Sequence, residues 1–282
     1  MSISAISPIY ARRDRDPLDM DFPTMRRPRL DSNDSSSRAL VPITPFLLLC
    51  SPRTGSTLLT HALREHPGIR MYGEVFQDEL DARREGLGFP NEVFETGSDG
   101  ASYLSNNIYE ECAGDDELFA IGFKLFYMQA REPGARTAWR YLMHHRNLRI
   151  VHLTRDNLLE AFVSFVEARA SGRWLSEVDK LLRGAPMHVD TDECLAFLDQ
   201  IYSYRGWANQ AFCQHQVFEL SYERHLIADF GSAMTQVQKF LGVPPLRLPV
   251  LLRKQGTAPI ETRVINFDEV RRALRHTIHA IK

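Results

Sequence analysis

Apolar and polar positions fall into blocks that predict strands followed by helices. An apolar run at 46–50 ends in a small polar turn around Gly55, and an amphipathic segment with helical spacing follows it. Similar strand-like runs lie near residue 70 and at 120–126, 149–155 and 216–223, the last followed by a helix to Leu241. Strands that alternate with helices build α/β folds. The pattern therefore predicts one α/β domain, with a mostly parallel sheet flanked by helices.

The first 44 residues do not share this pattern. They contain seven arginines, six aspartates, no lysine and a run of three serines at 35–37. A segment of this composition has little apolar surface to bury, so we expect 1–44 to be a flexible N-terminal arm. Residues 45–282 are long enough to bury one substantial core and are expected to form the folded domain.

Bulk properties exclude several classes of protein. The net charge of −2 gives no attraction to nucleic acid, and no apolar stretch is long enough for a membrane span or a signal peptide. The four cysteines form no C-x-x-C pair, so reduced thiols are expected, without a metal site. These features favour a cytoplasmic protein with no nucleic-acid partner and no membrane span; they do not determine its oligomeric state.

The polar turn after the first apolar run has the composition of an anion-binding loop. It reads Ser51-Pro52-Arg53-Thr54-Gly55-Ser56-Thr57. Gly55 permits close backbone approach, and the N–H groups at the start of the next helix attract an anion. A Walker A loop requires lysine after its second glycine, where this chain has Ser56. A phosphatase loop would have arginine six positions after Cys50, and Ser56 stands there as well. A phosphate or sulfate ester is therefore favoured over ATP or GTP.

A second candidate anion site follows about a hundred residues later. Arg155 ends an apolar run, and Asn157 with Glu160 has the pattern of a capping box for a helix through about 170. Ser164 lies two turns into that helix. A guanidinium and a hydroxyl together could bind a phosphate. In the alternative interpretation, Arg155 pairs with an acidic neighbour and Ser164 is a surface residue.

These two motifs resemble those of sulfotransferases that use 3′-phosphoadenosine 5′-phosphosulfate (PAPS). The resemblance covers about 45–282 and implies a P-loop-like fold. It assigns the 5′-phosphosulfate to Arg53, Thr54, Gly55, Ser56 and Thr57, and the 3′-phosphate to Arg155 and Ser164. Many family members space the last two residues by eight positions, but here the interval is nine. On a continuous helix the extra residue would turn the serine by roughly 100°, unless the turn at 156–157 absorbs it.

The segment around Glu74 resembles tyrosylprotein and bacterial nodulation-factor or lipopolysaccharide sulfotransferases. The resemblance implies that Glu74 is the general base that deprotonates the acceptor hydroxyl. Lys124, a single lysine in an apolar run, either extends its ammonium to solvent or faces an anion. By the same resemblance it would stabilise the leaving phosphate oxygen. Arg253 and Lys254 would fold over the nucleotide, or would simply form a solvated basic loop.

The sequence thus predicts sulfuryl transfer from PAPS, without a metal, to an acceptor hydroxyl, with a carbohydrate or glycolipid favoured over a phenol or lipid alcohol. Two alternatives stay open, a nucleotide-dependent kinase of the same fold and a catalytically silent nucleotide-binding module. His66 and His152 are the next candidates for the base. Lone histidines at such positions are more often hydrogen-bonded parts of the structure.

Overall fold

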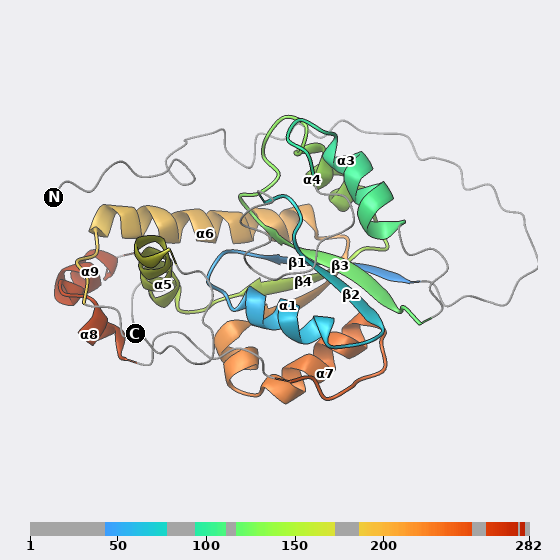
Figure 1. The fold of residues 1–282 in the computed structure, drawn as a ribbon. Coiled ribbons are helices and arrows are strands. Elements are labelled where there is room, and N and C mark those ends of the chain that lie inside the picture. Colours follow the sequence, from blue (N-terminus) through green and yellow to red (C-terminus); the bar gives the residue numbers. More distant parts are fainter. Residues whose placement is uncertain are drawn as a thin grey trace, which may run out of the picture.

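The computed structural model describes residues 43–77, 94–110, 117–172, 186–249, 258–275 and 277–279 (Figure 1). Of the arm expected at 1–44, only Ile43 and Thr44 are among these residues, and Thr44 already belongs to the first strand. Arg253 and Lys254 lie outside the described residues, so the two interpretations of that loop stay predictions.

The described chain forms a five-stranded sheet in which every neighbouring pair of strands is parallel. The strands are β1 (Thr44–Cys50), β2 (Ile69–Glu74), β3 (Ala120–Phe126), β4 (Arg149–Thr154) and β5 (Gln216–Ser221), in the order β2-β3-β1-β4-β5. The predicted parallel sheet flanked by helices is confirmed. In open sheets of this kind ligands bind outside the carboxyl ends of the strands, where the strand order reverses. β1 occupies that central position.

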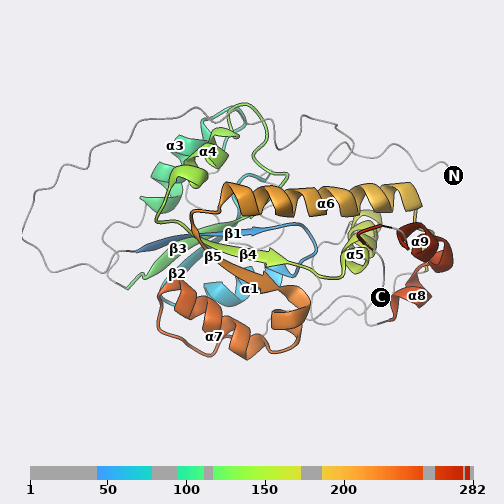
Figure 2. The same ribbon diagram turned by 180° about the vertical axis from the view of Figure 1, so that it is seen from behind.

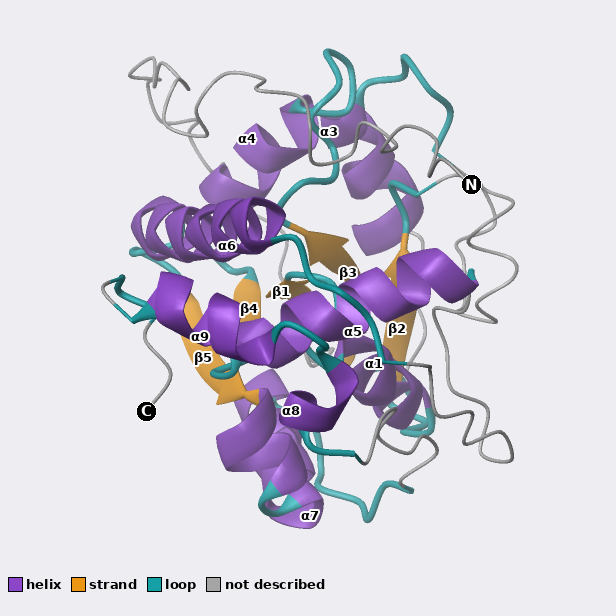
Figure 3. Ribbon diagram, turned by 90° about the vertical axis from the view of Figure 1, so that its left-hand side faces the viewer, coloured by secondary structure: helices purple, strands orange, loops and turns teal. Residues whose placement is uncertain are grey.

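Helices cover both faces of the sheet and one of its ends (Figures 1 and 2). One face is covered by α1 (Ser56–Arg64) and α7 (Phe230–Leu241), the latter preceded by η2 (Tyr222–Ile227). The opposite face is covered by α3 (Gly100–Tyr103), η1 (Leu104–Tyr109), α4 (Thr137–His144) and α6 (Thr191–Ala211). At the end lie α5 (Leu158–Ser171), α8 (Ile260–Arg263) and α9 (Phe267–Leu274). Figure 3 views the molecule from that end.

The central strand is apolar throughout because both of its faces are buried. Phe46 and Leu48 belong to the apolar cluster with α1 and α7, whereas Leu47 and Leu49 belong to the cluster with α4 and α6. All four side chains are at most 1% exposed. A strand buried on both faces has a continuous apolar run instead of an alternating one. The polar turn that follows is therefore fixed to the core.

Two of the predicted helices show how well capping residues in the sequence mark the ends of helices. α5 begins as expected, because Asn157 is its N-cap and accepts a hydrogen bond from the Glu160 N–H. The helix expected after the last strand is instead divided. Asp229 caps a new helix, α7, by accepting from the Ser232 N–H, and Gly242 ends α7 in the left-handed conformation.

Gly122 provides a test of how closely the central strands pack. A Cβ at this position of β3 would overlap both the carbonyl oxygen and the ring of Phe46 on β1. We expect Gly122→Ala to lower the free energy of unfolding by about 1–3 kcal/mol or more, measured by urea denaturation. Gly206→Ala in α6 is the matched control, because a Cβ there meets nothing within 4 Å; it should stabilise by about 0.5–1 kcal/mol. Unchanged stability of Gly122→Ala would contradict the packing.

Candidate active site

The turn after β1 has the backbone geometry of an anion cradle. Arg53 and Gly55 both adopt the left-handed conformation, with φ of 63° and 82°, and Gly55 is the N-cap of α1. The Thr54 hydroxyl donates to the carbonyl of Ser51 at 2.8 Å and so stabilises the turn. The first N–H groups of a helix lack partners within the helix, and successive N–H groups in such a turn form an anion-binding concavity. The cradle expected at 51–57 is therefore present as a strand, a tight turn and a helix start.

Gly55 is required for space as well as for its backbone conformation. A Cβ at this position would lie 2.5 Å from the ring of Tyr222, the first residue of η2. The same ring lies against Arg155, whose guanidinium carbon is 5.0 Å from the ring centroid. Tyr222 therefore packs between the cradle and the residue that follows β4.

Hydrogen bonds connect the cradle to the second predicted anion site. Arg155 Nη1 donates to the carbonyl oxygen of Arg53 at 2.9 Å, and Arg53 Nε donates to Ser164 Oγ at 3.0 Å. Despite the nine-residue spacing, Ser164 lies within hydrogen-bond distance of Arg53, which accepts from Arg155. α5 starts only at Leu158, so 155–157 precede the helix.

The surroundings of Arg155 suit a phosphate. Its side chain is 7% exposed, and among the described residues its Nε makes no hydrogen bond. Its nearest acidic atoms are Glu223 Oε1, 3.4 Å from Nε, and Glu160 Oε2, 3.7 Å from Nη2. The pairing with an acidic neighbour that the sequence left open is therefore present, as ion pairs with Glu160 and Glu223 that are too long for hydrogen bonds. A buried guanidinium with an unused donor fits a phosphate group.

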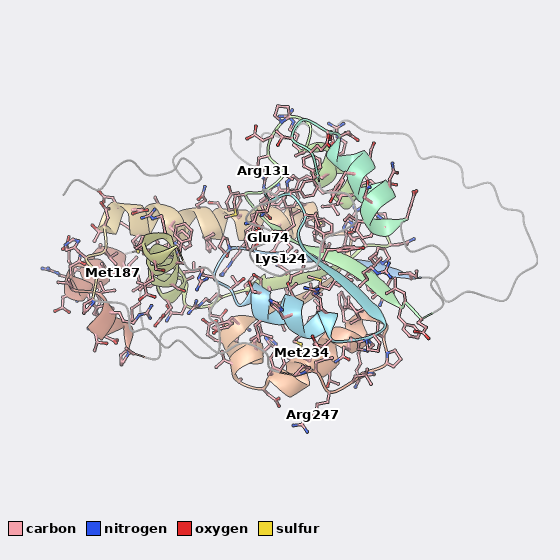
Figure 4. The ribbon with its side chains drawn as sticks, viewed as in Figure 1. Glu74, Lys124, Arg131, Met187, Met234 and Arg247 are labelled. Atoms are coloured by element: carbon pink, nitrogen blue, oxygen red, sulfur yellow. The ribbon has the colours of Figure 1, made fainter. Side chains whose placement is uncertain are left out.

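Glu74 and Lys124 form a buried ion pair (Figure 4). Lys124 Nζ lies 2.7 Å from Glu74 Oε1, and the two side chains are 1% and 6% exposed respectively. A register shift between β2 and β3 places Glu74, instead of Gly73, opposite Lys124. Lys124 therefore does not extend to solvent, and the anion that it faces among the described residues is the Glu74 carboxylate.

This ion pair lies close to the cradle. Burial raises the pKa of the Cys50 thiol to about 12, and the charges of Lys124 and Glu74 both contribute to that shift, in opposite directions. Cys50 ends β1 directly before the cradle, so the pair and the turn share one edge of the sheet. The raised pKa also agrees with Cys50 being an inert buried residue.

Some residues that shape the site were not predicted. Gln129 Nε2 donates to Glu74 Oε2 at 2.7 Å, so both carboxylate oxygens are held. Arg205 of α6 donates to the carbonyl of Arg155 at 2.6 Å. Gln129 is 55 positions from Glu74 in the sequence, and no local pattern marks either residue. Only the folded arrangement identifies them.

The two candidate histidines are hydrogen-bonded within the structure. His66 Nδ1 accepts from the Gly68 N–H at 3.0 Å, and His66 Nε2 donates to the carbonyl of Pro244 at 2.8 Å. The ring nitrogens of His152 lie 2.7 Å from the Tyr127 hydroxyl and 3.0 Å from Glu219 Oε1. Both histidines thus have the structural environment that the sequence favoured.

The described residues contain no group of three or more histidine, cysteine or acidic side chains arranged to hold a metal ion. None of their helices is both long enough and apolar enough to cross a membrane.

Comparison with known proteins finds nodulation proteins among the relatives in sequence and sulfotransferases among the solved structures. Nodulation protein H of Rhizobium meliloti (strain 1021) is 27% identical over 245 residues, which cover 83% of this chain and 93% of the relative. Nodulation protein H of Rhizobium tropici is 26% identical over 231 residues, which cover 81% of this chain and 88% of the relative. Among solved structures, a sulfotransferase from Alicyclobacillus acidocaldarius has 19% identity and a TM-score of 0.42, covering 84% of this chain and 96% of its own. Mouse sulfotransferase SULT7A1, complexed with PAP, has 14% identity and a TM-score of 0.42. The match covers 73% of this chain and 60% of the mouse protein chain.

A sequence model described as the Sulfotransferase family matches residues 45–247, which include the cradle, the Glu74–Lys124 pair and the Arg155 site. The chain belongs to the Sulfotransferase family and is an enzyme that transfers a sulfuryl group.

Proposed function

We propose that this sulfotransferase takes its sulfuryl group from PAPS and transfers it to a hydroxyl of a carbohydrate or glycolipid. The observation that carries the proposal is the hydrogen-bonded connection from Arg155 through Arg53 to Ser164. It joins two motifs that are more than 100 residues apart in the sequence. A nucleotide with phosphates at both its 5′ and 3′ positions requires two neighbouring anion sites of this kind.

In this proposal the two sites divide the donor between them. The N–H groups of the turn, Arg53 and the hydroxyls of Ser56 and Thr57 hold the 5′-phosphosulfate, and Arg155 with Ser164 holds the 3′-phosphate. Thr54 contributes through its backbone, because its buried hydroxyl donates to the carbonyl of Ser51. PAPS supplies a sulfuryl group already activated by its bond to phosphate. The kinase alternative is less well supported, because Ser56 occupies the place of the Walker A lysine.

Glu74 would accept the proton of the acceptor hydroxyl, and Lys124 would stabilise the negative charge on the leaving oxygen. Glu74 accepts the proton of the acceptor hydroxyl while the acceptor oxygen bonds to sulfur and the bond between sulfur and the phosphate oxygen breaks. Once Glu74 is protonated, its negative charge no longer balances the ammonium of Lys124. Lys124 can then stabilise the negative charge that develops on the leaving oxygen. The 2.7 Å contact makes this exchange possible within one buried pair.

The acceptor is inferred from similarity. The segments around Glu74 and Arg155 resemble those of bacterial sugar-modifying sulfotransferases, and the relatives include nodulation proteins from two species of Rhizobium. From the sequence we expect 77–116 and 175–213 to form the acceptor pocket, and parts of both segments, 78–93, 111–116 and 175–185, lie outside the described residues. The cytoplasmic location expected from the sequence stays a prediction.

Replacing Arg155 tests the assignment of the 3′-phosphate. Arg155→Ala removes a buried charged donor and should weaken the binding of adenosine 3′,5′-bisphosphate by about 1.5–3 kcal/mol, on the order of 10- to 150-fold, in calorimetry. Adenosine 5′-phosphosulfate lacks the 3′-phosphate, so its affinity should hardly change. Arg169→Ala is the control, because Arg169 pairs with Glu193 at the surface. Equal losses for the two nucleotides would refute the assignment.

Replacing Glu74 tests the chemistry. Glu74→Gln keeps the shape of the side chain but cannot accept a proton, so kcat should fall roughly 10²- to 10⁴-fold while nucleotide affinity stays within a few-fold. Glu193→Gln serves as the control. Near-wild-type turnover of Glu74→Gln would place the base elsewhere.

A further inference from the structure

A second buried arginine, Arg263 of α8, lies behind the predicted 3′-phosphate site. Its side chain is 9% exposed and binds two carboxylates of α5. Arg263 Nη1 donates to Glu160 Oε2 at 2.9 Å, while Nε and Nη2 donate to the two oxygens of Glu167 at 3.0 Å and 2.7 Å. The guanidinium therefore holds both acids on one side of the helix.

Glu160 lies between two arginines, and the distances show which of them holds it. The same oxygen, Oε2, is 2.9 Å from Arg263 and 3.7 Å from Arg155. The first distance is that of a charge-assisted hydrogen bond, and the second is too long for one. The acid closest to Arg155 along α5 is thus bound to a different cation.

The other acid beside Arg155 is occupied as well. Glu223 accepts hydrogen bonds from the N–H groups of Asp156 and Asn157, at 2.8 Å and 3.3 Å. Neither acid hydrogen-bonds Arg155, whose Nε has no hydrogen-bond partner among the described residues. This arrangement leaves a buried cation able to bind an external anion.

The backbone around Arg263 is anchored, so the side chain has a defined position. The Met187 N–H donates to the Arg263 carbonyl at 2.9 Å, and the Ile265 N–H donates to the Met187 carbonyl at 2.8 Å. Val264 is buried in the apolar cluster formed with α5, α6 and α9. Figure 4 labels Met187 beside α5, and Figure 3 shows α5, α8 and α9 packed together in front of the sheet.

We propose that Arg263 is a positioning residue for nucleotide binding, which holds Glu160 away from Arg155. Without Arg263, Glu160 would be a nearly buried carboxylate without a close cation, and the nearest remaining one is Arg155. A short Glu160–Arg155 pair would occupy the guanidinium and repel a phosphate. The inference rests on the proposed role of Arg155 in binding the 3′-phosphate.

The direct test is the nucleotide selectivity of Arg263→Met. Calorimetry should show a roughly 10- to 100-fold weaker affinity for adenosine 3′,5′-bisphosphate, on the order of the loss of one charge-assisted hydrogen bond or two. The affinity for adenosine 5′-monophosphate, which lacks the 3′-phosphate, should stay within about two-fold. A general loss of positive charge or of folding would instead weaken the binding of both nucleotides. Circular dichroism and thermal unfolding check the fold.

Two double variants separate the role of Glu160 from a general effect of charge. Arg263→Met with Glu160→Gln should regain most of the bisphosphate affinity, because the neutral amide cannot form an ion pair with Arg155. Arg263→Met with Glu167→Gln removes the same charge but leaves Glu160 ionised, so it should bind as weakly as Arg263→Met alone. The proposal would be overturned if the two substitutions in the Glu160 double variant changed the bisphosphate affinity independently of each other. It would also be overturned if both double variants regained the same affinity.

If Arg263→Met does not fold, Arg263→Lys replaces it. A single ammonium cannot hold both carboxylates as the guanidinium does, so a smaller but selective loss of about three- to tenfold is expected. Wild-type affinity in that variant would overturn the proposal.

Failure of the proposed function would look different: the wild type would not prefer the bisphosphate, or Arg155→Ala would bind it normally. If both of those behave as expected and the Arg263 variants match the wild type, only the role of Arg263 is wrong.

Discussion

The parallel pairing of β1 with β3 and β4 is the constraint on which the site depends. It brings the carboxyl ends of the three strands to one edge of the sheet, so that the cradle after β1 contacts Arg155 after β4, while Lys124 of β3 lies opposite Leu48 of β1. Because β1 is buried on both faces, the cradle cannot move without disturbing the core. The backbone of Arg53 can therefore act as a fixed acceptor for Arg155.

Two buried cations at this edge have different environments, and the difference indicates their tasks. Lys124 is in close contact with Glu74, which compensates the cost of burying either charge. Arg155 has acids nearby, but they bind other groups, and its Nε is unsatisfied within the described part of the chain. A buried ion pair such as Glu74–Lys124 is suited to accept a proton on the carboxylate while the ammonium stabilises a new negative charge. A buried guanidinium whose Nε has no hydrogen-bond partner among the described residues is suited to bind an anionic ligand.

The sequence predicted the features that depend on short segments. The cradle, the end of β4 directly before Arg155 and the cap of α5 at Asn157 are each determined within a few residues. The longer interval between Arg155 and Ser164 left two possibilities open, and α5 begins only at Leu158, after the residues expected to form a turn. Local signals also missed the division between η2 and α7, which depends on capping by Asp229.

Features that depend on distant segments could not be predicted. The β-bulge that places Glu74 opposite Lys124 is a property of strand pairing, and the contacts of Gln129 and Arg263 with glutamates join parts of the chain that lie 55 to 103 residues apart. No pattern in a single sequence specifies such pairs. They arise when helices and strands pack, and they then decide how the predicted residues are held.

The most direct test of the central claim is calorimetry of the wild-type protein with adenosine 3′,5′-bisphosphate, ADP and ATP. Two linked anion sites predict that the bisphosphate binds at least about tenfold more tightly than ADP or ATP, since only the bisphosphate places a phosphate on Arg155. ATP or ADP binding as tightly as the bisphosphate would contradict the account and favour a kinase of the same fold.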